Sequence, residues 1–377
     1  MRELVDGCTA IVRGALAAGC DFFAGYPITP ASSILMSMMQ ALPRRGGIAV
    51  QGEDEIASIG MCIGATLAGS RAMTATSGPG ISLYSEQIGL AIMGEVPLVI
   101  VDVQRLGPST GGATTVGQGD VQFVRWGTSG GYPVIALAPS SIPECYRLTA
   151  RAFELAERFR CPVFVLADKE LGLTLGTVEA EAWGPTPAPR GRVPAPGAGE
   201  SAGPPYRYQP PDGVPPLRPY GGAGAVRFTG STHDEGAWIT KDPATVDALN
   251  RHLLAKIEEH RGEIEMVATD LEPGATTLWL AYGITAGAVR EAVARARRAG
   301  RKVSAAVVQS LWPVPETALG AALGSVERVV VAELNPGQYR REIERLAGGL
   351  SPRPEVIGLH RLDGGLITPD QLLETLP

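Results

Sequence analysis

Four times near the start of the chain, a short apolar run ends in a loop of polar residues or glycines and is followed by a helix-like stretch. The loops read PITP (27–30), GEDE (52–55), SGPG (77–80) and RLGPSTGG (105–112). In a parallel α/β sheet the loops at the carboxyl ends of the strands converge on one crevice, where ligands bind. The sequence therefore predicts that these loops meet in space, bringing together Thr29, Glu55, Ser77 and Arg105.

The same alternation continues to about residue 178 and predicts a doubly wound parallel sheet. Its strands are expected at 21–26, 47–51, 72–76, 97–104, 132–138 and 161–168, and its helices at 3–18, 30–42, 55–68, 80–94, 120–126 and 141–159. A second alternating stretch predicts a smaller α/β domain. Its strands are expected at 276–282, 302–309, 328–333 and 355–358, and its helices at 243–260, 285–299, 315–323 and 338–346.

The segment between these two stretches has a different composition. Residues 184–224 contain 12 prolines and 9 glycines, which leaves too few apolar side chains for a core and too many breaks for helices. We interpret it as a connector whose tyrosines and arginines near 206–220 lie against the protein surface. The predicted division is 1–178, 179–245 and 246–377.

Composition limits the function classes. A chain of 377 residues with 45% hydrophobic composition can bury a sizeable core in each of two domains. The net charge of −6, without a cluster of basic residues, argues against a nucleic-acid partner. No apolar stretch is long enough to cross a membrane and the N-terminus lacks a signal core, so we expect a soluble cytoplasmic protein with no membrane partner.

The metal-binding residue types are scattered and predict no metal site. The five cysteines show no CxxC spacing, so they indicate neither a zinc site nor an iron–sulfur cluster and are interpreted as small buried hydrophobes in a reducing compartment. No two of the four histidines have metal-ligand spacing. His233, in the loop STHDEG, is either bonded to its loop neighbours or in contact with a substrate.

Glu53, Asp54 and Glu55 fall in the first turn of a predicted amphipathic helix. Acidic side chains there interact favourably with the positive end of the helix dipole, which is sufficient to explain Glu53 and Asp54. Glu55 lies nearest the crevice between the strands, where a carboxylate can also act as an acid or a base.

The SGPG loop and Arg105 each allow two interpretations. The SGPG glycines permit close backbone approach and the following helix offers free N–H groups, so the loop either contacts a ligand or makes a tight turn. Arg105 ends a predicted central strand, and its partly buried cation needs a partner. That partner is either a substrate carboxylate or a structural pairing with Asp102 or Asp120.

Five segments together resemble the α subunit of 2-oxoacid:ferredoxin oxidoreductases, most closely the 2-oxoglutarate type: GYPITP, EDEIASIG, SGPGISLYSE, VDVQRLGPSTG and ELNPGQ. The resemblance covers nearly the whole chain. It implies the pyrimidine-binding domain of thiamine diphosphate enzymes, with its doubly wound parallel sheet, plus a smaller α/β domain like the transketolase C-terminal domain.

The resemblance also implies residue roles. Glu55 would hydrogen-bond N1′ of the aminopyrimidine and promote the tautomer that removes the proton from C2 of the thiazolium. Thr29 would lie near the substrate and Arg105 would hold its carboxylate, with Ser109, Thr110 and the segment 228–238 as further neighbours. Cofactor contacts are implied for Pro27, Ile28, Ser77, Gly78 and Gly80.

A separate β subunit is implied as the partner, because in this family it supplies the Mg²⁺ and diphosphate site and a [4Fe–4S] cluster. This chain contains neither the GDG motif of that site nor clustered cysteines. The resemblance further implies an (αβ)₂ heterotetramer, ferredoxin as the electron acceptor and coenzyme A as the co-substrate.

One loop departs from the 2-oxoglutarate type. After GPSTG the chain reads GATTVGQGD, which leans toward relatives that use branched-chain 2-oxoacids. We expect 2-oxoglutarate as the substrate, with 2-oxoisovalerate or pyruvate as alternatives. A non-redox thiamine enzyme component is a further alternative, and a non-catalytic scaffold is disfavoured because Glu55, Thr29 and Arg105 are all present.

Overall fold

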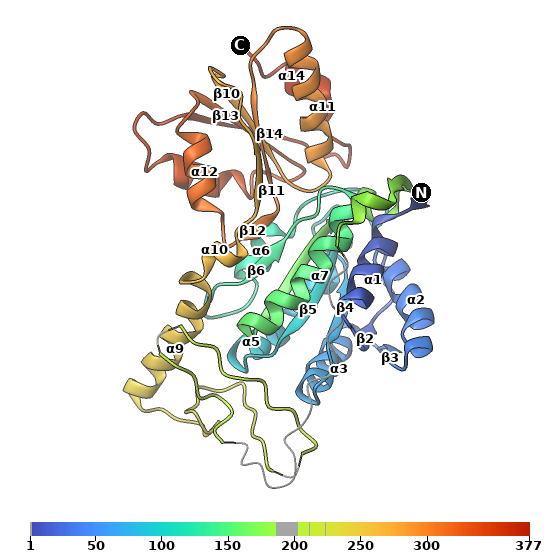
Figure 1. Ribbon diagram of the computed structural model, residues 1–377, viewed down its shortest axis with the longest axis vertical. Helices are drawn as coiled ribbons and strands as arrows, with labels where there is room; N and C mark the ends of the chain where they lie inside the picture. Colours follow the sequence, from blue (N-terminus) through green and yellow to red (C-terminus); the bar gives the residue numbers. More distant parts are fainter. Residues whose placement is uncertain (1, 186–202, 211, 223) are drawn as a thin grey trace.

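The computed structural model describes residues 2–185, 203–210, 212–222 and 224–377 (Figure 1). Part of the predicted connector, residues 186–202, lies outside the described residues. The second sheet stands at one end of the molecule and the described part of the connector at the other, with the first sheet between them (Figure 1). No described helix combines the length and the apolar character needed to cross a membrane.

The first sheet has seven strands in the order β12-β6-β7-β5-β4-β2-β3. Their bounds are β2 Phe22–Gly25, β3 Ile48–Gln51, β4 Ala72–Thr76, β5 Leu98–Gln104, β6 Ile135–Leu137, β7 Pro162–Asp168 and β12 Ser310–Trp312. All neighbours are parallel except β12, which runs antiparallel to β6. The central strands β4, β5 and β7 are buried along their whole length, as expected when helices cover both faces.

Helices cover both faces of this sheet. One apolar cluster joins the strands to α1 (Gly7–Ala17), α2 (Ser32–Ala41) and α7 (Ile142–Phe159). A second cluster, on the other face, joins them to α3 (Glu55–Leu67), α4 (Pro79–Leu83), α5 (Ser85–Met93) and α6 (Val121–Trp126). The predicted doubly wound architecture is confirmed. Because β2, β3, β4 and β5 run parallel, the loops that follow them lie at the same edge of the sheet, its carboxyl edge.

Two predicted helices are wrong in detail. Residues 3–18 do not form one helix: β1 (Arg2–Val5) pairs antiparallel with β8 (Gly176–Glu179), and α1 begins at Gly7. The Asp6 side chain accepts a hydrogen bond from the Thr9 N–H at 2.7 Å and so caps α1. The predicted helix 80–94 divides at Tyr84, whose buried hydroxyl lies 2.8 Å from the Thr74 hydroxyl.

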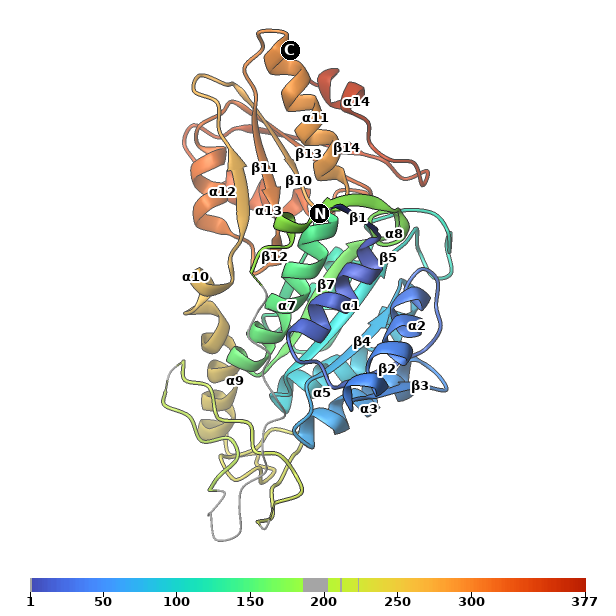
Figure 2. The same cartoon turned by 45° about the vertical axis from the view of Figure 1, so that its right-hand side comes forward.

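The second sheet has five strands in the order β14-β13-β10-β11-β9, all parallel except β9. Their bounds are β9 Val267–Asp270, β10 Thr277–Ala281, β11 Ser304–Val308, β13 Arg328–Glu333 and β14 Glu355–His360. Figure 2 shows α11 (Thr285–Arg298) and α14 (Pro369–Leu373) on one side and α12 (Glu316–Leu323) and α13 (Arg340–Ala347) on the other. The second apolar cluster continues into this unit, so the two sheets share a core.

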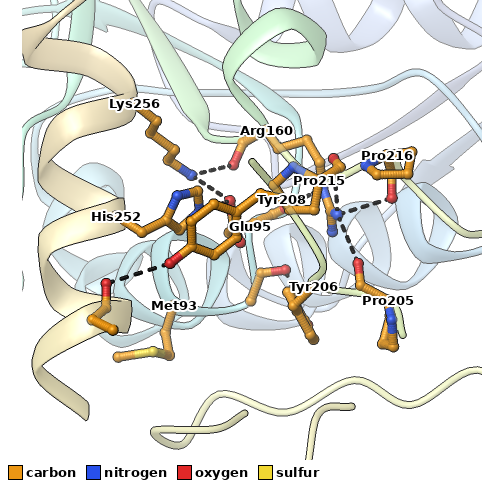
Figure 3. Close-up of polar contacts among 12 residues, drawn as sticks. Met93, Glu95, Arg160, Pro205, Tyr206, Tyr208, Pro215, Pro216, His252 and Lys256 are labelled. Atoms are coloured by element: carbon orange, nitrogen blue, oxygen red, sulfur yellow. Dashed lines mark hydrogen bonds and ion pairs between the residues drawn. The ribbon is translucent and has the colours of Figure 1, made fainter. Parts of the chain in front are cut away.

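A buried ion cluster lies before β5, at the amino end of the first sheet (Figure 3). Lys256, on α9 (Pro243–Glu258), donates from Nζ to Glu95 Oε2 at 2.9 Å, and His252 Nε2 lies 2.9 Å from the same oxygen. Burial alone would raise the pKa of Glu95, but Lys256, His252 and Arg160 stabilise its carboxylate and lower the pKa to about 2. The ionised state of Glu95 therefore stabilises the fold fully above its ordinary pKa of 4.5, and this contribution is lost as the pH falls toward 2.

The same cluster anchors the connector. Arg160 donates from Nη1 to the carbonyls of Pro205, Pro215 and Pro216 at 3.1–3.4 Å (Figure 3). Tyr208 stacks on His252 with ring centroids 3.7 Å apart. The expectation that the tyrosines near 206–220 lie against the protein is therefore confirmed for Tyr206, which is only 3% exposed, and for Tyr208, whereas Tyr220 is 40% exposed.

We expect Lys256→Met to lower the free energy of unfolding by about 3–5 kcal/mol, because it leaves the buried Glu95 carboxylate without its closest cation. Chemical denaturation measures this loss, and Lys241→Met, at an exposed lysine, is the matched control. Adding Glu95→Gln should recover much of the loss, because the uncompensated charge is then gone. A loss no larger than that of Lys241→Met would show that the cluster contributes little.

Candidate active site

The four polar loops do meet at the carboxyl edge of the first sheet. Arg105 ties two of them together, because its Nη1 donates to the Thr29 carbonyl at 2.6 Å. Its Nη2 donates to the Thr110 carbonyl at 3.2 Å, within its own loop. The SGPG loop adjoins this group: a Cβ atom built on Gly78 would lie 3.5 Å from Arg105 Nε.

Glu55 begins α3 and packs over the SGPG loop. Its side chain is 7% exposed, and a Cβ atom on Gly80 would lie 3.0 Å from Glu55 Oε1 and 2.0 Å from Thr76 Oγ1. Only glycine fits at position 80, so the close approach of the carboxylate to the backbone is a requirement of the packing. Asp54 caps the helix through a 2.7 Å hydrogen bond from the Ala57 N–H, in agreement with a helix-terminus role for this residue.

The SGPG loop presents a buried hydroxyl with no partner. Ser77 is fully buried and its Oγ forms no hydrogen bond within the described residues. Buried hydroxyls are normally satisfied, so the Ser77 hydroxyl, on the loop that Glu55 packs over, is a candidate group for a ligand to bond. The backbone of Gly78 has a φ of +41°, a conformation that favours glycine and brings the chain close to Arg105.

Thr29 contributes its carbonyl rather than its hydroxyl to the contact with Arg105. Thr29 and Pro27 are exposed, whereas Ile28 is half-buried and packs against the core of the first sheet. The turn is thus fixed by Ile28 on one side and by Arg105 on the other.

Arg105 is 5% exposed, and its Nε has no hydrogen-bond partner within the described part of the chain. No carboxylate of a described residue lies within 4.0 Å of the guanidinium, so the predicted alternative of an ion pair with Asp102 or Asp120 is not formed. Three of its five N–H groups make no hydrogen bond to a described residue. A buried arginine with free donors can bind an anionic group.

A cavity of about 480 Å³ opens between the loops after β4 and β5 and the loop after β13. Gly78, Ser109 and Asp120 line it from the first unit, and Leu334, Asn335 and Gln338 line it from the second. Of the predicted site residues, only Gly78 and Ser109 reach this cavity. The others lie on the loops that contact Arg105 or Glu55: Pro27, Ile28 and Thr29 on the PITP turn, Ser77 and Gly80 on the SGPG loop, and Thr110 on the loop after β5.

The second unit closes the site through the motif ELNPGQ (333–338). Asn335 donates to the Gln118 carbonyl at 2.8 Å, and Gln338 donates to the Gly119 carbonyl at 2.6 Å. The sequence reasoning assigned no role to these amides. Their position at the end of a predicted strand was the available signal, because the carboxyl ends of strands carry ligand-binding loops.

Three buried carboxyl groups near the cavity have raised pKa values. Burial and then the Asp120 charge raise the pKa of Asp102, and burial raises the pKa of Asp120 to about 6. Burial also raises the pKa of Asp168 to about 7, although its Oδ2 accepts a hydrogen bond from the Ile284 N–H at 2.5 Å. Asp168 thus joins the end of β7 to the start of α11 in the second unit.

The segment 228–238 does not lie near Arg105, contrary to the prediction. Phe228 packs against Gly94 and His233 Nε2 lies 3.4 Å from the Met93 carbonyl, both before β5 at the amino end of the sheet. The His233 ring also packs against the Tyr206 ring, with centroids 4.0 Å apart and the planes tilted by 38°. His233 is therefore a loop histidine bonded to its neighbours, because the connector carries this segment to the opposite edge.

Several large apolar side chains are exposed on the elements that flank the Glu55 site. They lie on or beside β2, α2, β3, α3 and α4: Tyr26, Met36, Met39, Ile48, Ile56 and Leu83. Exposed apolar side chains are typical of a protein–protein interface where they form a contiguous patch.

No group of His, Cys, Asp and Glu in the described ranges could hold a metal ion. The five cysteines are all free and buried, as predicted.

Comparison with known families identifies both parts of the chain. Residues 13–249 match the family described as pyruvate flavodoxin/ferredoxin oxidoreductase, thiamine diphosphate-binding. Residues 275–372 match pyruvate:ferredoxin oxidoreductase core domain II.

Individual proteins show the same relationship. The chain is 40% identical over 380 residues to the 2-oxoglutarate synthase subunit KorA of Methanothermobacter thermautotrophicus, covering 99% of this chain and 97% of that protein. It is similar to the structure of 2-oxoglutarate:ferredoxin oxidoreductase from Magnetococcus marinus with 2-oxoglutarate, coenzyme A and succinyl-CoA bound (TM-score 0.88, 31% identity). That match covers 99% of this chain but 64% of the other.

A more distant similarity concerns the fold alone. A split-gene transketolase matches 98% of this chain and 94% of its own chain with a TM-score of 0.55 at 14% identity. Together these matches confirm the expected fold class, an α/β thiamine-diphosphate-binding domain in a transketolase-like architecture.

Proposed function

Because this chain belongs to the 2-oxoacid:ferredoxin oxidoreductase family, we propose that it is the α subunit of an enzyme that converts 2-oxoglutarate and coenzyme A to succinyl-CoA and CO₂. Two electrons pass one at a time to ferredoxin. The resemblance noted in the sequence is confirmed at the level of the family. The observation that carries the proposal is the meeting of Glu55, the SGPG loop and Arg105 at one sheet edge in a chain so similar to KorA.

The residues around Glu55 fit the pyrimidine end of thiamine diphosphate. A buried carboxylate, an unsatisfied Ser77 hydroxyl and the side-chain-free backbone of Gly78 suit a flat heterocycle with donor and acceptor atoms, while Gly80 lets Glu55 pack close to the loop. When bound, this cofactor supplies the nucleophilic carbon and the electron sink for decarboxylation. Glu55 would hold the proton at N1′ of the aminopyrimidine, and the PITP turn, with Pro27 and Ile28, would close the ring's other side.

Arg105 would bind the carboxylate of the oxoacid. Its guanidinium is fixed by two carbonyls and retains free donors, so a carboxylate can approach without displacing an existing ion pair. Thr29, Ser109 and Thr110 stand on the loops that hold this arginine and would surround the substrate.

A β subunit would complete the site. The described residues contain no metal-binding group, and the apolar side chains exposed beside Glu55 would be covered by a partner chain. The β subunit would provide Mg²⁺, the diphosphate site and the [4Fe–4S] cluster, in an (αβ)₂ assembly.

The test is anaerobic reduction of a viologen dye by this chain co-produced with its β subunit. With thiamine diphosphate and coenzyme A present, we expect dye reduction with 2-oxoglutarate, and none by either subunit alone. A preference for 2-oxoisovalerate would agree with the branched-chain character of the loop GATTVGQGD and would identify that acid, rather than 2-oxoglutarate, as the substrate. An assembled complex that lacks iron and reduces no dye with any oxoacid, pyruvate included, would indicate a non-redox thiamine enzyme and overturn the proposal.

A further inference from the structure

A pair of carboxyl groups lies behind Arg105 and has no part in the function proposed above. Asp102, on β5, is 0% exposed, and neither of its carboxylate oxygens has a full hydrogen bond within the described residues, although the Asp120 carboxyl and the Gly78 N–H face it. Asp120 directly precedes α6. Its Oδ2 is shielded from solvent, while the residue as a whole lines the cavity.

The pair has uncharged neighbours on the adjacent strands and a cation, Arg105, that acts on both carboxyl groups. The residues that pair with Asp102 on the neighbouring strands, Thr76 on β4 and Leu166 on β7, are uncharged. Across the cavity the second unit presents the amides of Asn335 and Gln338. Arg105 is the positive group that acts on both carboxyl groups. The third buried carboxyl, Asp168, contacts Ile284 rather than the pair.

Two carboxylates at hydrogen-bonding range in a buried site cannot both ionise readily, so they share one proton. The shared proton satisfies oxygens that would otherwise lack a donor. It also leaves the pair with a single negative charge opposite the single positive charge of Arg105. Burial raises the pKa of both groups, in agreement with a retained proton.

We infer that Asp102 and Asp120 are positioning residues that hold one proton between them and thereby keep Arg105 available to the carboxylate of the substrate. With the proton present, the guanidinium stays on the Thr29 and Thr110 carbonyls with its free donors toward the ligand. Loss of the proton adds a second negative charge, which attracts the guanidinium and repels the incoming anion. The inference rests on the proposed function, because it takes the ligand of Arg105 to be an oxoacid.

Proton linkage determines whether the KM for the oxoacid rises or falls with pH. An anion that binds best to the protonated pair takes up a proton when it binds above the pKa of the pair. Above the pKa at which the pair loses its last proton, the KM for the oxoacid should therefore rise with pH, approaching tenfold per pH unit, whereas the KM for coenzyme A should not.

The test uses Asp120→Asn and Asp102→Asn in the assembled αβ enzyme. An amide donates a hydrogen bond to the remaining carboxylate as a protonated carboxyl would, but it cannot lose that hydrogen. We expect both variants to lose the rise of the oxoacid KM with pH that the wild-type enzyme shows. Asp168→Asn, at a buried carboxyl that does not face Arg105, is the matched control and should retain the pH dependence.

A binding measurement gives a second readout that is independent of turnover. Calorimetry of 2-oxoglutarate binding to the complex without thiamine diphosphate, in two buffers of different ionisation enthalpy, should show proton uptake in wild type over the pH range in which its KM rises, and none in Asp120→Asn. A wild-type enzyme that turns over with a flat KM profile, or variants with the wild-type slope, would overturn the inference alone. A wild-type complex without turnover on any oxoacid would instead overturn the proposed function.

Discussion

Glu55→Gln is expected to lower turnover of the assembled enzyme on the order of 10²–10⁴-fold, the usual range for loss of a positioned acid–base group. Glutamine keeps the shape of the side chain beside Gly80 but cannot carry the negative charge that would hold a proton at the pyrimidine ring. Dye reduction measures the rate, and size-exclusion chromatography should show an unchanged assembly.

Glu53→Gln is the matched control for Glu55→Gln. Glu53 lies just before the same helix terminus but is exposed, so its change tests the general effect of removing an acidic charge there. We expect it to leave turnover nearly unchanged. Near-normal activity of Glu55→Gln would refute the role assigned to Glu55 and favour a non-catalytic subunit.

Arg105→Gln should raise the KM for the oxoacid roughly 10- to 150-fold, which corresponds to a charge-assisted hydrogen bond of about 1.5–3 kcal/mol. Glutamine can still donate to the Thr29 carbonyl, so the loop contact is partly kept while the charge is lost. Arg105→Ala removes both the charge and the hydrogen bond to the Thr29 carbonyl, so it should raise the KM for the oxoacid further. The KM for coenzyme A should change far less in either variant.

The control for Arg105 is Arg207→Ala. Arg207 is an exposed arginine in the connector that pairs with Glu235, far from the site in the fold. The Arg207→Ala variant should leave the KM for the oxoacid and the KM for coenzyme A unchanged. Equal increases in the KM for the oxoacid and for coenzyme A in Arg105→Gln would count against a direct contact with the substrate carboxylate.

The sheet that carries the site could be predicted from the sequence because its strands are strongly patterned. The predicted bounds of β4 and β13 agree with the structure at both ends, and each is a nearly continuous apolar run beside a helix. The convergence of the four loops follows from that topology, so the contact between Arg105 and the PITP turn needed no information about tertiary structure beyond the sheet itself.

The short antiparallel strands could not be predicted, because their pairing depends on distant partners. β12 has three residues and gains its place by pairing with β6, far away in the sequence. β9 pairs with β11, and β1 with β8, also by contacts that local periodicity does not encode. Segments this short do not show a reliable period in the sequence.

The sequence predicted the site residues that directly follow strands of the first sheet, but not those from other parts of the chain. Asp120, Asn335 and Gln338 were not proposed as site residues, because they come from a long loop and from the second unit, and their proximity depends on how the two sheets pack. The misplacement of 228–238 has a similar cause. Its position is determined by Tyr206 and Glu95 at the opposite edge, through a connector whose path the composition does not specify.

The place of β12 also bears on how the protein is made. The ribosome completes β6 long before it reaches Ser310, and at about 5–20 residues per second the delay is roughly 10–35 seconds. Throughout synthesis of the intervening chain, β6 has an open hydrogen-bonding edge, which is a template for wrong pairing with other chains. The nascent protein therefore passes through an aggregation-prone stage that ends only when the last fifth of the polypeptide has begun to emerge, and chaperone supply during synthesis should govern its yield.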